Sequence, residues 1–246
     1  MDLMTHCLVP DWPAPANVKA LQTTRKGGVS KAPYDSFNLG SHVGDNPLAV
    51  SRNRMLLAPL LPSEPVWLNQ VHGTGVADAG HAGCLPGADA SVSTHPGAVC
   101  VVLTADCLPV LLCDAAGSVV AAAHAGWRGL CDGVIEAAVS AMEVPPDTLM
   151  AWLGPAIGPA RFEVGDEVRS AFVSKQAQAA TAFVPGADGK WLADLSQLAR
   201  LRLNALGVSR IHGGGLCTYS DPERFYSYRR DGVTGRMGTF IWITQV

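Results

Sequence analysis

The sequence predicts an α/β (α+β) fold, a three-layer α/β/α sandwich around a mixed β-sheet, in a single domain. Three apolar runs of strand length follow one another at 98–106, 108–114 and 119–124. Because these runs are apolar on both faces, helices should cover the sheet on both sides. Helical and strand patterns mix along the chain without strict βαβ alternation, which favours a mixed sheet over a fully parallel one.

The segment before the apolar runs predicts loops, one helix and short strands. Residues 21–45 are rich in Gly, Ser and Asn, which is typical of a strand followed by a long loop and a turn. Asn46-Pro47 is a typical helix start and Pro62 a typical stop, so a helix is expected over 47–61. The other expected elements are a strand over 66–71, a turn at 72–75, and a turn at 87–90 before a short strand.

The segment after the first two runs predicts mainly helices. Asp114 to Gly117 should link the second and third runs as a hairpin. An amphipathic stripe predicts a helix over 126–142, and Gly207 should close a later helix. The remaining expected elements are a strand that starts at 151 and ends at Gly154-Pro155, helices over 163–180 and 194–206, and strands over 208–211 and 238–243.

The composition of this chain of 246 residues is globular, and its net charge of -3 recruits neither nucleic acid nor an anionic membrane. The longest apolar runs are far shorter than the roughly 20 residues of a membrane span. The amino terminus lacks the pattern of a signal peptide, so a cytoplasmic location is expected. The seven cysteines show no disulfide-scaffold spacing and are expected to be mostly core thiols, with room for one ligand or nucleophile.

His72, Cys107 and His124 carry the strongest chemical signal in the sequence. Each lies where an apolar strand runs out into a turn that contains Gly or Pro. Strand ends are where side chains leave the core and converge on a cleft. Two imidazoles and a thiolate suit zinc and leave a fourth position open, which is the catalytic pattern. Their spacing by itself matches no compact zinc motif.

Carboxylates and arginines near these positions are further candidates. Asp106 lies inside an apolar run and needs a partner, so it could orient a ligand histidine, or it could form the turn. Asp89 could likewise orient a ligand histidine or form a turn. Several arginines lie in Gly-containing turns, where guanidinium forks and backbone N–H groups bind phosphate or carboxylate, although each could equally be surface charge. They are Arg25, Arg128, Arg229 and Arg230.

Eight motifs, spread over nearly the whole chain, together resemble one known family. They are TTRKGGVS, YDSFNLGSHVGD, WLNQVHG, TADCLPVLL, HAGWRGL, WLGPAIGP, FEVG and RFYSYRRDGVTGRMGTFIW. The chain resembles the laccase-domain family, also described as polyphenol oxidase or peptidoglycan editing factor. The family's better-supported description is that of purine nucleoside phosphorylases with adenosine deaminase and methylthioadenosine phosphorylase activity.

This resemblance implies one metalloenzyme domain over residues 1–246. His72, Cys107 and His124 match the family's metal ligands, with zinc as the expected metal and copper claimed for some members. The implied substrates are phosphate with adenosine, inosine, guanosine or methylthioadenosine, and adenosine deamination is implied at the same site. The implied contacts of substrate or phosphate are Arg25, Asn38, Gln70, Arg128 and Arg229.

Three alternatives stay open at this point. A copper-dependent polyphenol oxidase would use His2Cys as a blue-copper ligand set, but a multicopper enzyme also needs paired histidines, and none of the seven histidines forms an HxH pair. An amide hydrolase, which would suit peptidoglycan editing, would use Cys107 as nucleophile and His124 as base, with no need for His72. A purely structural zinc site would need a fourth ligand, which His42 or His212 could supply.

Overall fold

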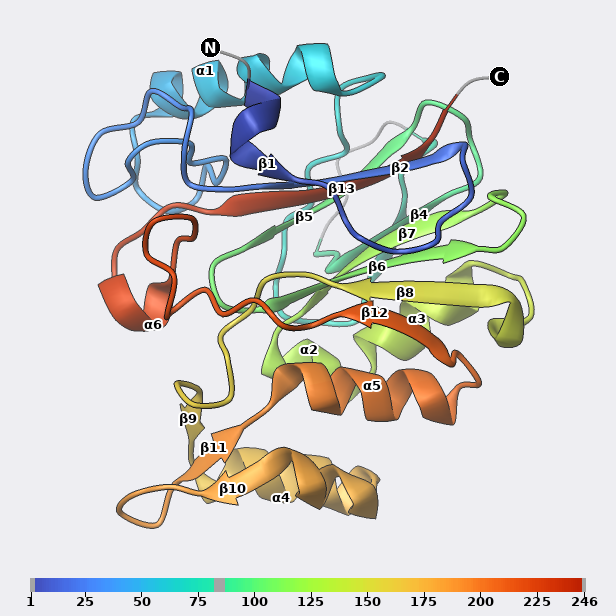
Figure 1. The fold of residues 1–246 in the computed structure, drawn as a ribbon, viewed down its shortest axis with the longest axis vertical. Helices are drawn as coiled ribbons and strands as arrows, with labels where there is room; N and C mark the ends of the chain where they lie inside the picture. Colours follow the sequence, from blue (N-terminus) through green and yellow to red (C-terminus); the bar gives the residue numbers. More distant parts are fainter. Residues whose placement is uncertain (1–2, 82–86, 245–246) are drawn as a thin grey trace.

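Two stacked β-sheets lie between layers of helices in the computed structural model, which describes residues 3–81 and 87–244 (Figure 1). The first sheet is antiparallel and consists, in spatial order, of β1 (Cys7–Leu8), β2 (Val18–Thr23), β13 (Met237–Ile243) and β5 (Val99–Thr104). The second is mixed and consists of β12 (Arg210–Gly213), β8 (Leu149–Leu153), β6 (Leu108–Asp114), β7 (Val120–Ala125), β4 (Ala90–Ser93) and β3 (Val76–Asp78). Its two edge pairs, β12 with β8 and β3 with β4, are parallel.

Helices cover the outer face of each sheet. The helix α1 (Pro47–Leu57) lies over the first sheet at the top of Figure 1. The outer face of the second sheet carries α2 (Trp127–Asp132), α3 (Val134–Ala141) and α5 (Leu195–Ala205). Beyond them lie α4 (Asp166–Lys175) and a small sheet of β10 (Phe183–Pro185), β11 (Trp191–Ala193) and β9 (Glu163–Val164). The short α6 (Tyr228–Asp231) precedes β13, and 3-10 turns occupy Leu3–His6, Ala58–Leu60, Pro146–Thr148 and Ala177–Ala182.

Apolar side chains fill three layers of core. Between the sheets, residues such as Val102 of β5 and Leu111 of β6 pack face to face. Residues of alternate register on β5 pack beneath α1, and those on β6 and β7 pack against α3 and α5. The central strands are therefore buried on both faces, as their continuous apolar runs predict.

The predicted α/β class with one domain is confirmed, and the structure adds a layer to the predicted sandwich. The expected apolar strands are divided between two sheets, because β5 belongs to the first and β6 to the second. An apolar run indicates burial of both faces but not whether a helix or another sheet provides it.

One predicted strand is wrong. The segment 66–71 forms no ladder, although it lies beside β5. Its one backbone–backbone bond to β5 runs from Val66 N to Val99 O (3.4 Å). Further along, the Gln70 side chain replaces backbone pairing, since Nε2 donates to Leu103 O (2.8 Å) and Oε1 accepts from Leu103 N (2.7 Å).

Two predicted helices are interrupted. The expected helix over 126–142 is divided at Gly133, whose φ of 109° is a left-handed conformation that a glycine adopts at little cost. The expected helix over 163–180 contains β9 at its start, α4 in the middle and a 3-10 turn at its end. The helix expected over 47–61 begins at Pro47, with Asn46 as its cap, but ends at Leu57.

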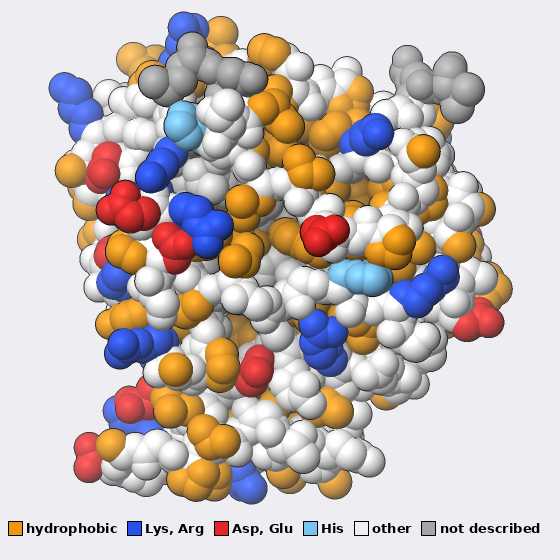
Figure 2. Space-filling model, in the orientation of Figure 1, with side chains coloured by type: hydrophobic (Ala, Val, Ile, Leu, Met, Phe, Trp, Pro, Cys, Tyr) orange, Lys and Arg blue, Asp and Glu red, His pale blue; other side chains and the backbone are white. Residues whose placement is uncertain are grey.

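On the face drawn in Figure 2, basic and acidic side chains are interspersed. In the part of the chain that the structure describes, no helix is both long and apolar enough to span a bilayer.

Asn53 of α1 holds the long loop that precedes this helix. Its side chain is fully buried. Its Nδ2 donates to Ser36 O (3.2 Å) and Asn38 O (2.9 Å), and its Oδ1 accepts from Val29 N (2.8 Å). This one amide therefore bonds three backbone groups of the loop, and in its absence these buried groups have no water to replace it.

We expect Asn53→Leu to lower the free energy of unfolding by about 2–4 kcal/mol, because several buried polar groups lose their partner. Urea unfolding followed by circular dichroism measures the change. The matched control is Arg52→Ala, since Arg52 is exposed on the same helix and this variant should stay within about 0.5 kcal/mol of the parent. Equal stability of the two variants would contradict this role of Asn53.

Candidate metal centre

His72, Cys107 and His124 converge at one end of the second sheet. Their donor atoms all lie within 4.8 Å of one another, and among the described residues this is the one such group of three or more His, Cys, Asp or Glu side chains. The Cys107 Sγ lies 3.8 Å from His72 Nε2, and the two imidazole rings are 4.9 Å apart between centroids. Two imidazoles and a thiol at this separation are a donor set that fits zinc or copper.

Asp89 fixes both histidines. Its fully buried carboxylate accepts from the backbone N–H groups of Val71 (3.0 Å), His72 (3.0 Å) and Gly73 (2.7 Å). The same carboxylate lies 2.7 Å from His124 Nδ1, which donates to it. His124 therefore keeps its other nitrogen, Nε2, for a ligand, and the turn that carries His72 is held although His72 itself has a left-handed φ of 60°.

Cys107 lies where the chain crosses from one sheet to the other. The turn between β5 and β6 contains Asp106 with a φ of 97°, a conformation that costs a residue other than glycine about 1–3 kcal/mol. The Asp106 carboxylate accepts from Thr218 Oγ1 (2.6 Å) and from Arg229 N (2.7 Å). Asp106 thus ties the Cys107 turn to the start of α6. Its side chain bonds no histidine of the group, so of its two expected roles the structure favours the turn over the orientation of a ligand histidine.

The three side chains shift one another's protonation. Burial alone would raise the pKa of the Cys107 thiol, but His124 and His72 outweigh it and lower this pKa to about 6. Burial would lower the pKa of His124, but the Cys107 thiolate and Asp89 raise it to about 9. The thiolate, which is the form that binds a metal or attacks an electrophile, is therefore favoured at neutral pH.

Two glycines let the backbone approach this group closely. A Cβ on Gly126 would lie 2.8 Å from His72 Cδ2 and 3.0 Å from Cys107 Sγ. A Cβ on Gly129 would lie 2.8 Å from Gly73 O. Gly126 joins β7 to α2 and leaves room for the donors, and Gly129 within α2 leaves room for the turn that carries His72.

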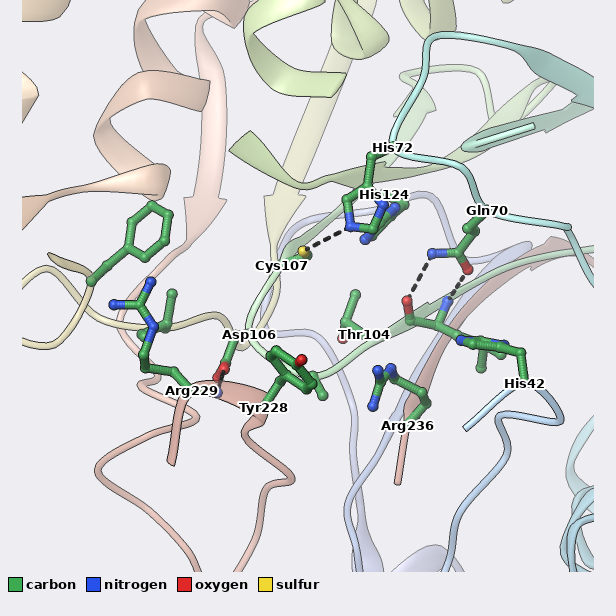
Figure 3. A pocket seen from close by; sticks show the side chains of 14 residues that line it. His42, Gln70, His72, Thr104, Asp106, Cys107, His124, Tyr228, Arg229 and Arg236 are labelled. Carbon is green, nitrogen blue, oxygen red and sulfur yellow. Dashed lines mark hydrogen bonds between the residues drawn. The ribbon is translucent and has the colours of Figure 1, made fainter. Parts of the chain in front are cut away.

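A cavity of about 440 Å³ opens beside the three donors (Figure 3). Its apolar wall includes Leu103, Ile157 and Phe162, and two guanidinium groups, of Arg229 and Arg236, line the side facing away from the histidines. A cavity of this volume holds a ligand the size of a nucleoside.

The residues predicted from motifs divide between the cavity and the surrounding structure. Gln70 and Arg229 line the cavity. Gln70 has both amide groups bonded to Leu103, whereas Arg229 donates from Nη1 to Glu163 O (2.9 Å) and lies over the Phe162 ring.

Arg25, Asn38 and Arg128 do not line this cavity and have structural contacts instead. Arg25 donates to Asp35 O and Pro222 O and lies over the Tyr226 ring. Asn38 is fully buried and bonds Gly40, Asp45 and the backbone of Arg236. Arg128 lies over Trp127, on the side of α2. None of the three is placed to contact a ligand beside the donors.

Sequence reasoning missed several cavity residues. Arg236 lies in the stretch RRDGVTGR, in which the pattern pointed to Arg229 and Arg230. Thr104 lies in an apolar run and was expected to be an ordinary strand residue. His42 lines the cavity but is not part of the donor group, and neither is His212. The cavity residues missed in this way include Thr104, Phe162 and Arg236.

Comparisons with known proteins give the family. Residues 19–244 match the family described as multi-copper polyphenol oxidoreductase laccase. A Pseudomonas aeruginosa protein described as a purine nucleoside phosphorylase is 57% identical over 241 residues, which are 98% of this chain and 99% of its own. The Escherichia coli purine nucleoside phosphorylase YfiH is 57% identical over 243 residues, 98% of this chain and 100% of that protein. The chain therefore belongs to this laccase-like family.

Solved structures share the fold. A Neisseria meningitidis protein superposes with a TM-score of 0.94 at 54% identity, covering 98% of this chain and 100% of the other. YlmD from Geobacillus stearothermophilus superposes with a TM-score of 0.85 at 31% identity, covering 95% of this chain and 94% of the other. The stacked-sheet arrangement is thus shared with other members.

We expect Asp89→Asn to weaken zinc binding by about 10–100-fold, because the carboxylate orients His124 and the turn of His72. Competition between the folded protein and a chromophoric chelator measures the affinity. Asp78→Asn is the matched control, since Asp78 is an exposed carboxylate at the end of β3. The assignment fails if both variants bind zinc as tightly as the parent.

We expect Gly126→Ala to weaken zinc binding by about tenfold or more with little change in the folded structure, because the new Cβ displaces His72 and Cys107. Gly126 has a φ of -63°, so alanine fits the backbone itself. Gly215→Ala is the control, since a Cβ there meets nothing within 4 Å. The same chelator competition applies, and unaltered zinc affinity of Gly126→Ala would count against the three-donor site.

Proposed function

We propose that this member of the laccase-like family is a zinc-dependent purine nucleoside phosphorylase that also deaminates adenosine. The proposed substrates are phosphate with adenosine, inosine, guanosine or methylthioadenosine. The names of the relatives support the phosphorylase class. The structural observation that carries the proposal is the His-Cys-His group at the wall of a nucleoside-sized cavity that also contains arginines.

The cavity separates groups suited to the two parts of a nucleoside. Phe162, Ile157 and Leu103 offer apolar surface to a purine, and the exposed Tyr228 ring borders the same space. The Arg236 guanidinium lies toward the other wall, where it would hold an anion beside the ribose (Figure 3). Binding both reactants in one cavity aligns them for reaction.

Phosphorolysis balances without an added reagent. An oxygen of the phosphate forms a bond to C1′ of the ribose, the bond from C1′ to the purine nitrogen breaks, and its electron pair leaves with the base. The proton that the phosphate loses neutralises the departing purine. Cationic side chains in the cavity stabilise the phosphate while its charge is redistributed.

Deamination of adenosine needs one water molecule. The oxygen of the water becomes bonded to C6, the bond from C6 to the amino nitrogen breaks, and ammonia leaves with the remaining proton. We place C6 toward His72, Cys107 and His124, which would hold the zinc. When bound, the zinc supplies Lewis acidity at this wall of the cavity.

An amide hydrolase with Cys107 as nucleophile is the second candidate. The lowered pKa of Cys107 beside His124 favours it, because a thiolate next to an imidazolium is a typical nucleophile. A multicopper oxidase has less support: a trinuclear cluster needs further histidines, and the described residues contain one donor group of this kind.

The test of the proposed function combines metal analysis with product analysis on the same sample. About one zinc per chain, together with phosphate-dependent release of the base or with inosine formed from adenosine, would support it. Several coppers per chain and no turnover of purines would support the oxidase. No metal, with hydrolysis of amide substrates that survives His72→Ala, would support the Cys107 hydrolase.

We expect Cys107→Ala to abolish zinc binding and purine turnover, because only two of the three donors remain. We expect the variant to retain the fold. Mass spectrometry of the purified protein gives the metal content, and circular dichroism checks the fold. Cys217→Ala is the control, since Cys217 is a half-buried thiol outside the donor group. Full zinc stoichiometry in Cys107→Ala would contradict the assignment of Cys107 as a metal ligand.

A further inference from the structure

Arg236 is a partly buried cation without an acidic partner. It immediately precedes β13 and lines the cavity. Its Nη1 donates to Thr234 O (3.0 Å) and Gly235 O (3.0 Å), which fixes the guanidinium in place. Its Nε and Nη2 donate to none of the described residues, and none of the ion pairs found among those residues includes Arg236. A fixed guanidinium edge that faces a cavity is suited to a bidentate anion.

Thr104 provides a second free donor in the same wall. It is the last residue of β5 and is 1% exposed, yet its hydroxyl has no hydrogen-bond partner among the described residues. It lines the cavity, and Figure 3 shows it between Cys107 and Arg236. The register of β5 and β13 explains the proximity, because Thr104 pairs with Met237, the neighbour of Arg236. A buried hydroxyl without a partner is destabilising, so a ligand that accepts its hydrogen bond is favoured at this position.

His42 completes this wall from the long loop before α1. It lines the cavity near Arg236 (Figure 3). Burial lowers the pKa of His42, and the charges of Arg236, Arg54 and His124 lower it further. The ring is therefore neutral at pH 7 and offers an N–H donor that adds no charge.

We propose that Arg236, Thr104 and His42 form the subsite for the phosphate that attacks the nucleoside, an inference that rests on the proposed phosphorylase function. The guanidinium edge binds two phosphate oxygens, and the Thr104 hydroxyl donates to one of them or to the third. Arg229, by contrast, is bonded to Glu163 O and lies over Phe162, at the wall assigned to the purine. Phosphate therefore enters on the Arg236 side, and the base occupies the Arg229 side.

The test measures phosphate and nucleoside binding separately in the zinc-loaded protein. We expect Arg236→Met to raise the KM for phosphate by about 10–100-fold, as loss of a charged hydrogen-bonding partner does. We expect the near-isosteric Thr104→Val to raise it by about fivefold. The KM for inosine should stay within about twofold in both variants. Arg128→Met is the matched control, since Arg128 lies outside the cavity, and its KM for phosphate should equal that of the parent.

Calorimetric titration with inorganic phosphate keeps this test independent of turnover. If the parent binds phosphate and both variants lose it while no phosphorolysis is found, phosphate binding at these residues stands, but the proposed function and the attacking role of this phosphate fail. If the parent turns over nucleosides and both variants keep the parent's affinity for phosphate, the subsite is wrong. If adenosine monophosphate binds far more tightly than adenosine, and Arg236→Met removes that difference, the wall binds a nucleotide phosphate and the proposal is overturned.

Discussion

Burial of the central strands on both faces is the constraint on which the rest of the structure depends. The strands β5, β6 and β7 pack against the other sheet on one side and against helices on the other. Such strands have no solvent-exposed face, so their polar and reactive side chains can reach solvent only where a strand begins or ends. The cavity and its donors accordingly lie at strand ends: Asp89 directly precedes β4, Thr104 ends β5, Cys107 directly precedes β6, and His124 is next to the last residue of β7.

Much of the fold could be predicted because apolar runs and caps are local signals. The positions of β5, β6 and β7, the start of α1 at Asn46-Pro47 and the hairpin at Asp114 follow from neighbouring residues alone. The second sheet could not be predicted, because an apolar strand reads the same beneath a helix or beneath another sheet. The strand predicted over 66–71 is wrong for a related reason. The alternation of this segment reflects its packing beside β5, where the Gln70 side chain forms the hydrogen bonds that a strand backbone would form.

The candidate site was predictable in its donors and only partly in its walls. Cys107 and His124 stand at strand ends, whereas His72 follows the segment 66–71, which lies beside β5 without forming a strand. The structure brings the three side chains together as expected. Arg25, Asn38 and Arg128 lie in equally distinctive motifs, yet Arg25 and Asn38 bond loop backbone and Arg128 lies over Trp127 on α2. A polar residue with a structural role and one that contacts a ligand cannot be told apart in a single sequence. Arg236 reaches the cavity through the pairing of β13 with β5, and no local pattern reveals a contact between segments so far apart.

The three donors differ in their access to solvent, with His72 exposed, Cys107 intermediate and His124 buried. An ion held by them would exchange with the surroundings ligand by ligand, starting at His72, while the core stayed closed. The rate of that exchange would then be governed by the backbone turn at His72, which the Asp89 carboxylate ties through three N–H groups. Metal loading and release would then need only local opening at the His72 turn and not global unfolding of the chain.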